Sequence, residues 1–179
     1  AGLVIAVSEA DASALKKIAP AARVAIVPNG VDTTYFSNNS AAGSMPDVTP
    51  CDLVFTGKMD FRPNVDAVLW FVQEVLPRVR AEEPAARFLI VGQNPPARLR
   101  ALADDPAVKL TGRVPDVRPY IAASAVYVVP MRIGGGTRLK VLEAMAMGKA
   151  IVSTSLGCEG YPVRDGAELL IADSPAAFA

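Results

Sequence analysis

Short apolar segments alternate with helical segments along most of the chain. Residues 53–56, 87–91 and 125–129 are largely apolar runs rich in β-branched side chains, and segments with helical spacing separate them. Strands that are apolar on both faces are typical of a parallel sheet with helices on both sides. The sequence therefore predicts an α/β fold built on a parallel sheet.

The same patterns give the expected elements. The predicted strands are residues 3–7, 24–27, 53–56, 87–91, 108–110, 125–129, 150–153 and 168–171, with 3–7 expected to be buried. The predicted helices are residues 98–102, 118–123 and 137–147, and two that follow Ser8 and Asn64 as N-caps. Pro77 is expected to end or kink the helix after Asn64. Ligands of open α/β sheets bind at the carboxyl ends of the strands, so functional residues are expected there.

Length and charge narrow the classes of function. The chain has 179 residues, enough for one domain or for one domain and a fragment. Its 18 basic residues balance 18 acidic ones, which argues against a nucleic-acid binder that depends on bulk electrostatics. Residues 37–50 are rich in Ser, Asn, Gly, Pro and Ala and form the predicted linker. The chain begins on an apolar run without Met, so we expect a piece of a longer protein.

Several chemistries are excluded by residues that the chain lacks. Histidine is absent, which excludes a Ser-His-Asp triad, a Cys-His dyad and a His-ligated metal. Cys51 and Cys158 are too few for a disulfide scaffold or a Cys-rich zinc site. We therefore expect no metal site. The apolar runs are too short to span a bilayer, and no secretory signal is expected.

The strongest local signal is a run of three glycines at residues 134–136, between a predicted strand and a predicted helix. Glycines let a backbone approach a ligand closely, and a helix N-terminus offers free N–H groups, so the run suits a phosphate. Arg138 and Lys140 add positive charge. The alternative is a plain tight turn with Thr137 as the N-cap. The spacing matches neither a Walker A loop nor a full dinucleotide fingerprint.

Glu143 lies on the apolar side of the predicted helix, where a carboxylate needs a partner. Helical side chains lean toward the N-terminus, which aims Glu143 back toward the glycines, about 10 Å away along the helix axis. There it could accept hydrogen bonds from a ribose diol. The alternative is a rim residue paired with Lys140, three residues earlier.

Two further loops follow predicted strands. In the first, Gly57 precedes Lys58, and Lys58 and Arg62 are candidate phosphate contacts; the alternative is that they are solvated surface cations. In the second, around Val114, main-chain groups could clamp a flat base; the alternative is a simple turn.

Six segments then combine into one pattern. They are Val7-Ser8-Glu9, Val27-Pro28-Asn29-Gly30-Val31-Asp32, Phe55-Thr56-Gly57, Leu89-Ile90-Val91-Gly92, Leu110-Thr111-Gly112-Arg113-Val114 and Leu142-Glu143-Ala144-Met145-Ala146-x-Gly148. In this order and spacing the chain resembles the carboxyl half of GT-B glycosyltransferases, specifically the retaining, nucleotide-sugar-dependent enzymes called family 4 or group 1. The resemblance implies a Rossmann-like, doubly wound parallel sheet.

The resemblance also implies a domain organisation. Residues 1–36 correspond to a remnant of the N-terminal acceptor domain and the crossover, residues 37–50 to a linker, and residues 51–179 to a C-terminally truncated donor domain. Because the active site of this fold lies between two domains, the chain alone is not expected to turn over. An exposed apolar face where the other domain would pack would favour a homodimer.

Site residues carry over from the family unevenly. Glu143 matches the second glutamate of the family's Glu-x7-Glu motif, which binds the donor ribose. Gly135, Gly136 and Thr137 match the helix N-terminus that holds the donor phosphates. The first glutamate of the motif, which contacts the transferred sugar, falls on Gly135, and this departure puts sugar recognition in doubt.

The remaining positions concern the diphosphate and the base. Lys58 matches the first of two basic phosphate ligands, and Lys58 and Glu143 are the expected catalytic residues. The second basic ligand, expected near Pro63, is missing, and Arg62 is a candidate replacement. Val114 matches a position whose main chain contacts the base.

By resemblance, the expected function is retaining transfer of a glycosyl group from a nucleoside diphosphate sugar to an acceptor hydroxyl, without a cofactor. The expected partners are the nucleotide sugar and a glycan or lipid-linked acceptor bound through the missing N-terminal domain, with no nucleic acid. The protein is expected in the bacterial cytoplasm or at the inner face of the membrane. Two alternatives stay open: a nucleotide-binding module without transfer activity, and a nucleotide-sugar epimerase.

Overall fold

The computed structural model describes residues 2–38 and 47–179, so most of the predicted linker lies outside the described residues. Its main feature is a parallel sheet with the strand order β5-β4-β3-β6-β7-β8. The strands are β3 (Asp52–Thr56), β4 (Arg87–Val91), β5 (Val108–Gly112), β6 (Val126–Val129), β7 (Ala150–Ser153) and β8 (Leu170–Ile171). The chain starts at the centre, winds to one edge through β4 and β5, and then crosses back to β6. This order is that of a Rossmann-like doubly wound sheet, and the predicted fold class is confirmed.

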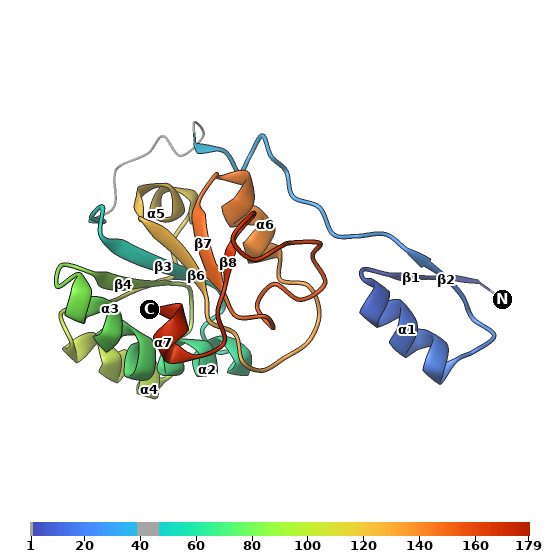
Figure 1. The fold of residues 1–179 in the computed structure, drawn as a ribbon, viewed down its shortest axis with the longest axis horizontal. Coiled ribbons are helices and arrows are strands. Elements are labelled where there is room, and N and C mark those ends of the chain that lie inside the picture. Colours follow the sequence, from blue (N-terminus) through green and yellow to red (C-terminus); the bar gives the residue numbers. More distant parts are fainter. Residues whose placement is uncertain (1, 39–46) are drawn as a thin grey trace.

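Helices cover both faces of this sheet (Figure 1). They are α2 (Arg62–Trp70), the π-helical turn η2 (Phe71–Val75), α3 (Leu76–Glu82), α4 (Ala97–Arg100), the 3₁₀ turn η3 (Ala101–Asp104), α5 (Arg118–Ala123), α6 (Leu139–Ala146) and α7 (Pro175–Phe178). In Figure 1, α2, α3, α4 and α7 lie on one side, and α5 and α6 on the other. None of the described helices is long and apolar enough to cross a membrane.

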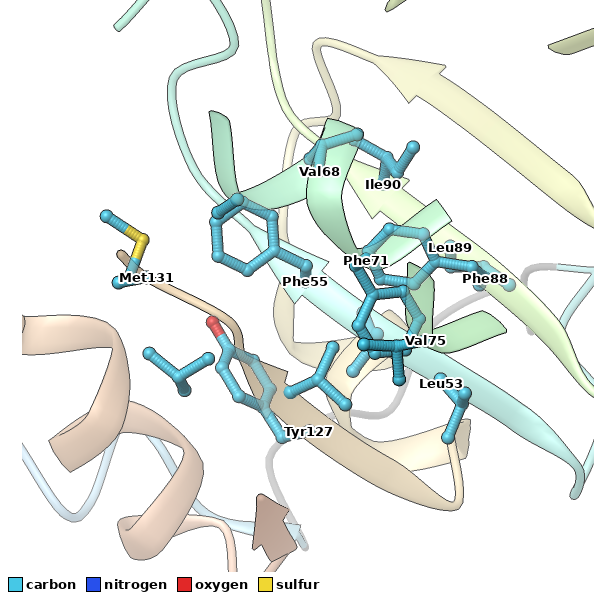
Figure 2. Packing of buried hydrophobic residues seen from close by; sticks show 14 of the residues in the cluster. Leu53, Phe55, Val68, Phe71, Val75, Phe88, Leu89, Ile90, Tyr127 and Met131 are labelled. Atoms are coloured by element: carbon cyan, nitrogen blue, oxygen red, sulfur yellow. The ribbon is translucent and has the colours of Figure 1, made fainter. Parts of the chain in front are cut away.

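The core occupies both faces of the sheet, and its buried residues include Val68 of α2 on one side and Val141 of α6 on the other (Figure 1). Figure 2 shows Phe55 and Leu53 of the central strand β3 among the side chains of α2, η2 and β4. The rings of Phe71 and Phe88 lie 4.3 Å apart, and Phe178 of α7 packs against Phe71. This packing fixes β3 and α2, and with them the turn between these two elements.

The prediction that Asn64 caps the helix after β3 is wrong. Helix α2 begins two residues earlier, at Arg62, after Phe61, which makes no side-chain capping bond. Pro63 occupies the first turn, where its missing N–H leaves no hydrogen bond unmade. Asn64 is therefore already inside the helix, and its side chain is free to bond elsewhere.

The helix does not end at Pro77. The Leu76 amide bonds to the carbonyl of Phe71, five residues back, and Pro77 lies in the first turn of α3. Proline lacks an N–H and its ring crowds the preceding turn. The wider π turn absorbs both effects, so the helical segment continues to Glu82.

A small N-terminal unit lies apart from the main sheet in Figure 1. It consists of the parallel strands β1 (Leu3–Ala6) and β2 (Arg23–Ile26) and the helix α1 (Glu9–Ile18). The Ser8 side chain accepts the Asp11 amide at 3.1 Å, so the predicted cap is confirmed. The expected burial of the first strand is wrong, because Leu3 and Ile5 are 58% and 60% exposed. A two-stranded sheet with one helix has too few partners to cover both faces.

Candidate functional site

A pocket of 340 Å³ opens at the carboxyl edge of the sheet, next to the switch point between β3 and β6. Its lining comes from the ends of β3 and β4, from the loops that follow β3, β4 and β5, and from α6. The lining residues are Thr56, Gly57, Val91, Gly92, Gln93, Arg113, Val114, Val117 and Glu143. Open α/β sheets bind ligands at this kind of position.

Glu143 is the carboxylate in this pocket. Within residues 2–38 and 47–179, its side chain makes no hydrogen bond or salt bridge. Burial raises the pKa of Glu143, and the positive charge of Lys140 partly opposes that rise. The pair with Lys140 that sequence left open as an alternative does not form, because the Lys140 ammonium donates to Oδ1 of Asn64 at 3.1 Å. The carboxylate of Glu143 therefore faces the pocket with unused acceptor capacity.

Lys140 lies beside this pocket, against the turn that follows β3. Its Nζ atom is 3.9 Å from the centre of the Phe55 ring. Burial lowers the pKa of Lys140 to about 7, with Glu143 opposing that shift and Arg138 adding to it. This lysine can therefore gain or lose its proton near neutral pH.

The glycine run forms an irregular loop ahead of α6. Gly134 and Gly136 have φ values of 97° and 83°, in the left-handed region that favours glycine. Helix α6 begins only at Leu139, so the predicted start at residue 137 is wrong, and the alternative of Thr137 as the N-cap is wrong as well, because Arg138 is the N-cap. The reason lies in Arg138, which is extended, buried and hydrogen-bonded to two carbonyls of the loop.

Those two bonds run from Arg138 to the carbonyl oxygens of Gly136 at 2.5 Å and of Gly134 at 3.0 Å. The guanidinium also lies 3.6 Å from a carboxylate oxygen of Glu159. The guanidinium of Arg138 thus stabilises the glycine loop through hydrogen bonds to its carbonyl groups. The sequence predicted that Arg138 contacts a phosphate. In the structure, however, Arg138 lines neither of the two pockets described here.

A second pocket of 190 Å³ lies on the other side of the glycine run, between it and the start of α1. Its lining residues are Ser8, Ala10, Asp11, Gly135, Gly136, Thr137, Glu159 and Gly160. A Cβ atom added to Gly135 would meet nothing within 4 Å. The position that departs from the family motif therefore borders open space, with two carboxylates among the lining residues.

The other predicted residues are spread along the same edge. Gly57 and Val114 line the larger pocket. The Lys58 side chain is 60% exposed, and its ammonium is 3.6 Å from Asp60. Arg62 is exposed at the start of α2 and lines neither pocket.

Three residues of this region were missed by sequence reasoning. Asp11 and Glu159 line the smaller pocket, and no local pattern around either carboxylate marks it as part of a site. Asn64 was assigned to a cap, although Pro63 before it signals a helix that has already begun. The described residues hold no group of three or more His, Cys, Asp or Glu side chains that could bind a metal ion.

Comparison with known proteins agrees with the fold and with the geometry of this site. Residues 50–179 match the family described as "Glycosyl transferases group 1". The chain belongs to this family. One relative of this group 1 chain is phosphatidyl-myo-inositol mannosyltransferase of Mycobacterium tuberculosis. The two are 31% identical over 144 residues, which are 78% of this chain and 37% of the relative.

A second relative of this group 1 chain is an uncharacterized 44.6 kDa protein in the cps region of Klebsiella pneumoniae. It is 28% identical over 141 residues, covering 74% of this chain and 36% of that protein. The chain thus spans little more than a third of the length of these curated relatives.

Solved structures agree on the fold of the group 1 chain. Sucrose-phosphate synthase from Thermosynechococcus elongatus superposes with a TM-score of 0.71 at 21% identity, over 97% of this chain and 45% of that one. HepE from Anabaena, in complex with UDP-glucose, superposes with a TM-score of 0.65 at 18% identity, over 97% and 50%. These matches confirm the predicted GT-B fold.

Proposed function

We propose that this chain is the donor-binding half of a retaining glycosyltransferase, which binds a nucleoside diphosphate sugar and presents its glycosyl group to an acceptor hydroxyl. The observation that carries the proposal is the carboxylate of Glu143. It faces the pocket at the switch point without a partner among the described residues, on a helix whose start meets the glycine run. A half-buried carboxylate in that position suits a pair of hydroxyl donors.

Each part of the donor has a counterpart along the carboxyl edge. The ribose diol would donate to Glu143, and the base would lie against the main chain at Val114. The diphosphate would lie at the glycine run and the start of α6, because the first amides of a helix lack intrahelical partners and favour an anion. Lys140 and the exposed Lys58 supply positive charge to the same region.

The glycosyl group would extend past the glycine run into the smaller pocket. Asp11, Glu159 and the backbone of Gly135 border that space. Carboxylates are strong acceptors for sugar hydroxyls, and the absence of a side chain at Gly135 leaves room for the ring. Transfer itself would depend on cations and helix dipoles that stabilise the leaving diphosphate.

The relatives support this proposal in kind. One relative is a phosphatidyl-myo-inositol mannosyltransferase, and the HepE structure holds UDP-glucose. The acceptor would bind through the amino-terminal half of a GT-B fold, and the β1–α1–β2 unit would be a remnant of that half.

The test is a thermal-shift and calorimetric panel of UDP, GDP, ADP and their sugar conjugates. One nucleotide at 100 times its dissociation constant should stabilise the chain by about 2.7 kcal/mol. Glu143→Gln removes the acceptor charge and should weaken binding of that nucleotide about tenfold. Glu82→Gln, an exposed carboxylate on α3, is the matched control and should bind like the parent chain. No stabilisation by any member of the panel would overturn the proposal.

A second function is favoured by one observation, the glycine at position 135. A chain without the first glutamate of the motif could bind the nucleotide and have lost transfer. Glycosyl transfer measured with a protein that contains both halves of the fold would rule this alternative out.

A further inference from the structure

A side-chain contact crosses the switch point of the sheet. Helices α2 and α6 lie on opposite faces of the sheet, yet both begin at its carboxyl edge, after the neighbouring strands β3 and β6 (Figure 1). Nζ of Lys140, from the first turn of α6, donates to Oδ1 of Asn64, from the first turn of α2, at 3.1 Å. The contact joins residues 76 positions apart along the chain.

The other end of the Asn64 amide holds the loop that follows β3. Its Nδ2 donates to the carbonyl oxygen of Lys58 at 2.9 Å, and Asn64 is only 6% exposed. Gly57 lies between the two partners. A Cβ atom there would lie 2.7 Å from Nδ2 of Asn64 and 3.0 Å from Nζ of Lys140. One buried amide thus fixes both the turn and the ammonium behind it.

The surroundings of Lys140 leave its charge poorly compensated. From α6 the only opposite charge acting on it is Glu143, and Arg138 ahead of the helix repels it. From β3 and α2 it meets the Phe55 ring and the neutral Asn64 amide, and the nearby phenol of Tyr127 on β6 is bonded to Thr56. Within the described residues, no carboxylate forms a salt bridge with Lys140. An anionic ligand bound near Lys140 would therefore be attracted by a charge that no salt bridge within the described residues neutralises.

We infer that Asn64 is a positioning residue, which holds the Lys140 ammonium against the Gly57–Lys58 turn so that its charge acts on a bound diphosphate. The inference rests on the proposed function and deepens it. Lys140 then takes the part of a second basic ligand, for which Arg62 was the candidate in the sequence. Neither residue lines one of the two pockets, but Arg62 is exposed, whereas Lys140 is held in place by a buried partner.

The pH dependence gives the inference a specific signature. The diphosphate of a nucleotide sugar is doubly esterified and lacks the terminal phosphate ionisation near pH 6. Its own charge is therefore constant between pH 6 and 9. The pKa of Lys140 is about 7 in the free chain, and a bound diphosphate raises it. Affinity should then fall about tenfold between pH 6 and pH 8, because binding takes up a proton.

The experiment measures dissociation constants by calorimetry from pH 6 to 9. The ligands are whichever of UDP-glucose, GDP-mannose and ADP-glucose stabilises the chain most, and the matching nucleoside without phosphates. The parent chain should show the tenfold fall for the nucleotide sugar and a flat profile for the nucleoside. Lys140→Met should give a flat profile for both ligands, at the weak affinity that the parent shows at high pH.

Lys149→Met is the matched lysine control. Burial also lowers the pKa of Lys149, but its ammonium bonds the carbonyls of Ala122 and Ser124 at the opposite edge of the sheet, ahead of β7. This variant should keep the pH profile of the parent chain. A flat profile in Lys149→Met would mean that Lys149, and not Lys140, causes the pH dependence, and it would overturn the inference.

Two variants test Asn64 itself. Asn64→Ala should weaken nucleotide-sugar binding several-fold at pH 6 and leave nucleoside binding unchanged, whereas damage to the fold would weaken both. Asn64→Asp keeps an acceptor for Lys140 and adds a charge, so it should move the midpoint of the profile to higher pH. Nucleotide-sugar binding with a flat profile in the parent chain would overturn this inference alone. Failure of every nucleotide sugar to bind would overturn the proposed function and the inference together.

Discussion

The side-chain amide of Asn29 donates a hydrogen bond to the hydroxyl of Thr137 at 2.5 Å, across 108 positions of sequence. This bond connects the segment after β2 directly to the glycine run ahead of α6. A second anchor lies further along the same segment, where the Arg118 guanidinium is 3.7 Å from the centre of the Tyr35 ring. The N-terminal unit is thus tied to the loop that would hold the donor phosphates.

Thr137→Val keeps the shape of the side chain and removes the acceptor for Asn29. We expect faster amide hydrogen exchange in α1 and β2, because one of the ties to the main sheet is lost, with a cost of about 1 kcal/mol at most. Thr33→Val, at an exposed position of the same segment, is the control and should leave exchange unchanged. Unchanged exchange in Thr137→Val would mean that the bond does not restrain the unit.

Gly57→Ala tests the close packing under the turn after β3. The added Cβ would press on Asn64 at 2.7 Å and on Lys140 at 3.0 Å, so one of these side chains must move. We expect a loss of about 1–3 kcal/mol in unfolding free energy, measured by urea titration, and weaker nucleotide-sugar binding. Gly30→Ala is the control, because a Cβ there meets nothing within 4 Å. Equal stability of the two variants would contradict the packing described.

The free chain should become more stable as the pH rises above 7, through Lys140. Its pKa is about 7 in the folded chain and about 10.5 when unfolded, so the unfolded state binds more protons between these values. Unfolding free energy therefore rises with pH across that interval. In Lys140→Met this contribution is absent. Urea unfolding at pH 6.5 and 9 should show a larger gain for the parent chain than for Lys140→Met, and equal gains would refute the prediction.

Glu159→Gln probes the smaller pocket. If its carboxylate accepts a sugar hydroxyl, the variant should lose about tenfold in affinity for the nucleotide sugar and none for the nucleoside diphosphate. Calorimetry with both ligands measures the two effects side by side, with Glu82→Gln as the control. Equal losses for both ligands would mean that the variant acts through Arg138, which Glu159 contacts, instead of through the sugar.

The local pattern of the chain predicts most of the sheet. The predicted strands at 87–91 and 150–153 and the helix at 118–123 coincide with β4, β7 and α5. These segments are set by continuous apolar runs and by Pro or Gly at their ends, which act within a few residues. The four-residue helix α7 was missed, because it has less than two turns of periodic pattern.

The site was predictable where it depends on strand order and not where it depends on long-range contacts. Gly57, Val114 and Glu143 were each placed near a strand end or a helix start, and the structure brings them into one pocket. The partner of Lys140 was not predictable, because i−3 and i+3 spacing favours Glu143 and the observed partner is Asn64. That choice depends on how α2 and α6 meet at the switch point, which a single sequence does not encode locally.

The contact between Asn64 and Lys140 also has a consequence for the folding of the chain. Its two side chains meet only after the strands on both sides of the crossover have paired, so the proposed diphosphate site cannot exist in a half-assembled molecule. A nucleotide sugar would bind the finished chain alone and would protect it selectively from proteases. Adding such a ligand during expression should therefore raise the yield of intact protein. The amount of protein retained on a nucleotide resin would measure the fraction of correctly folded molecules.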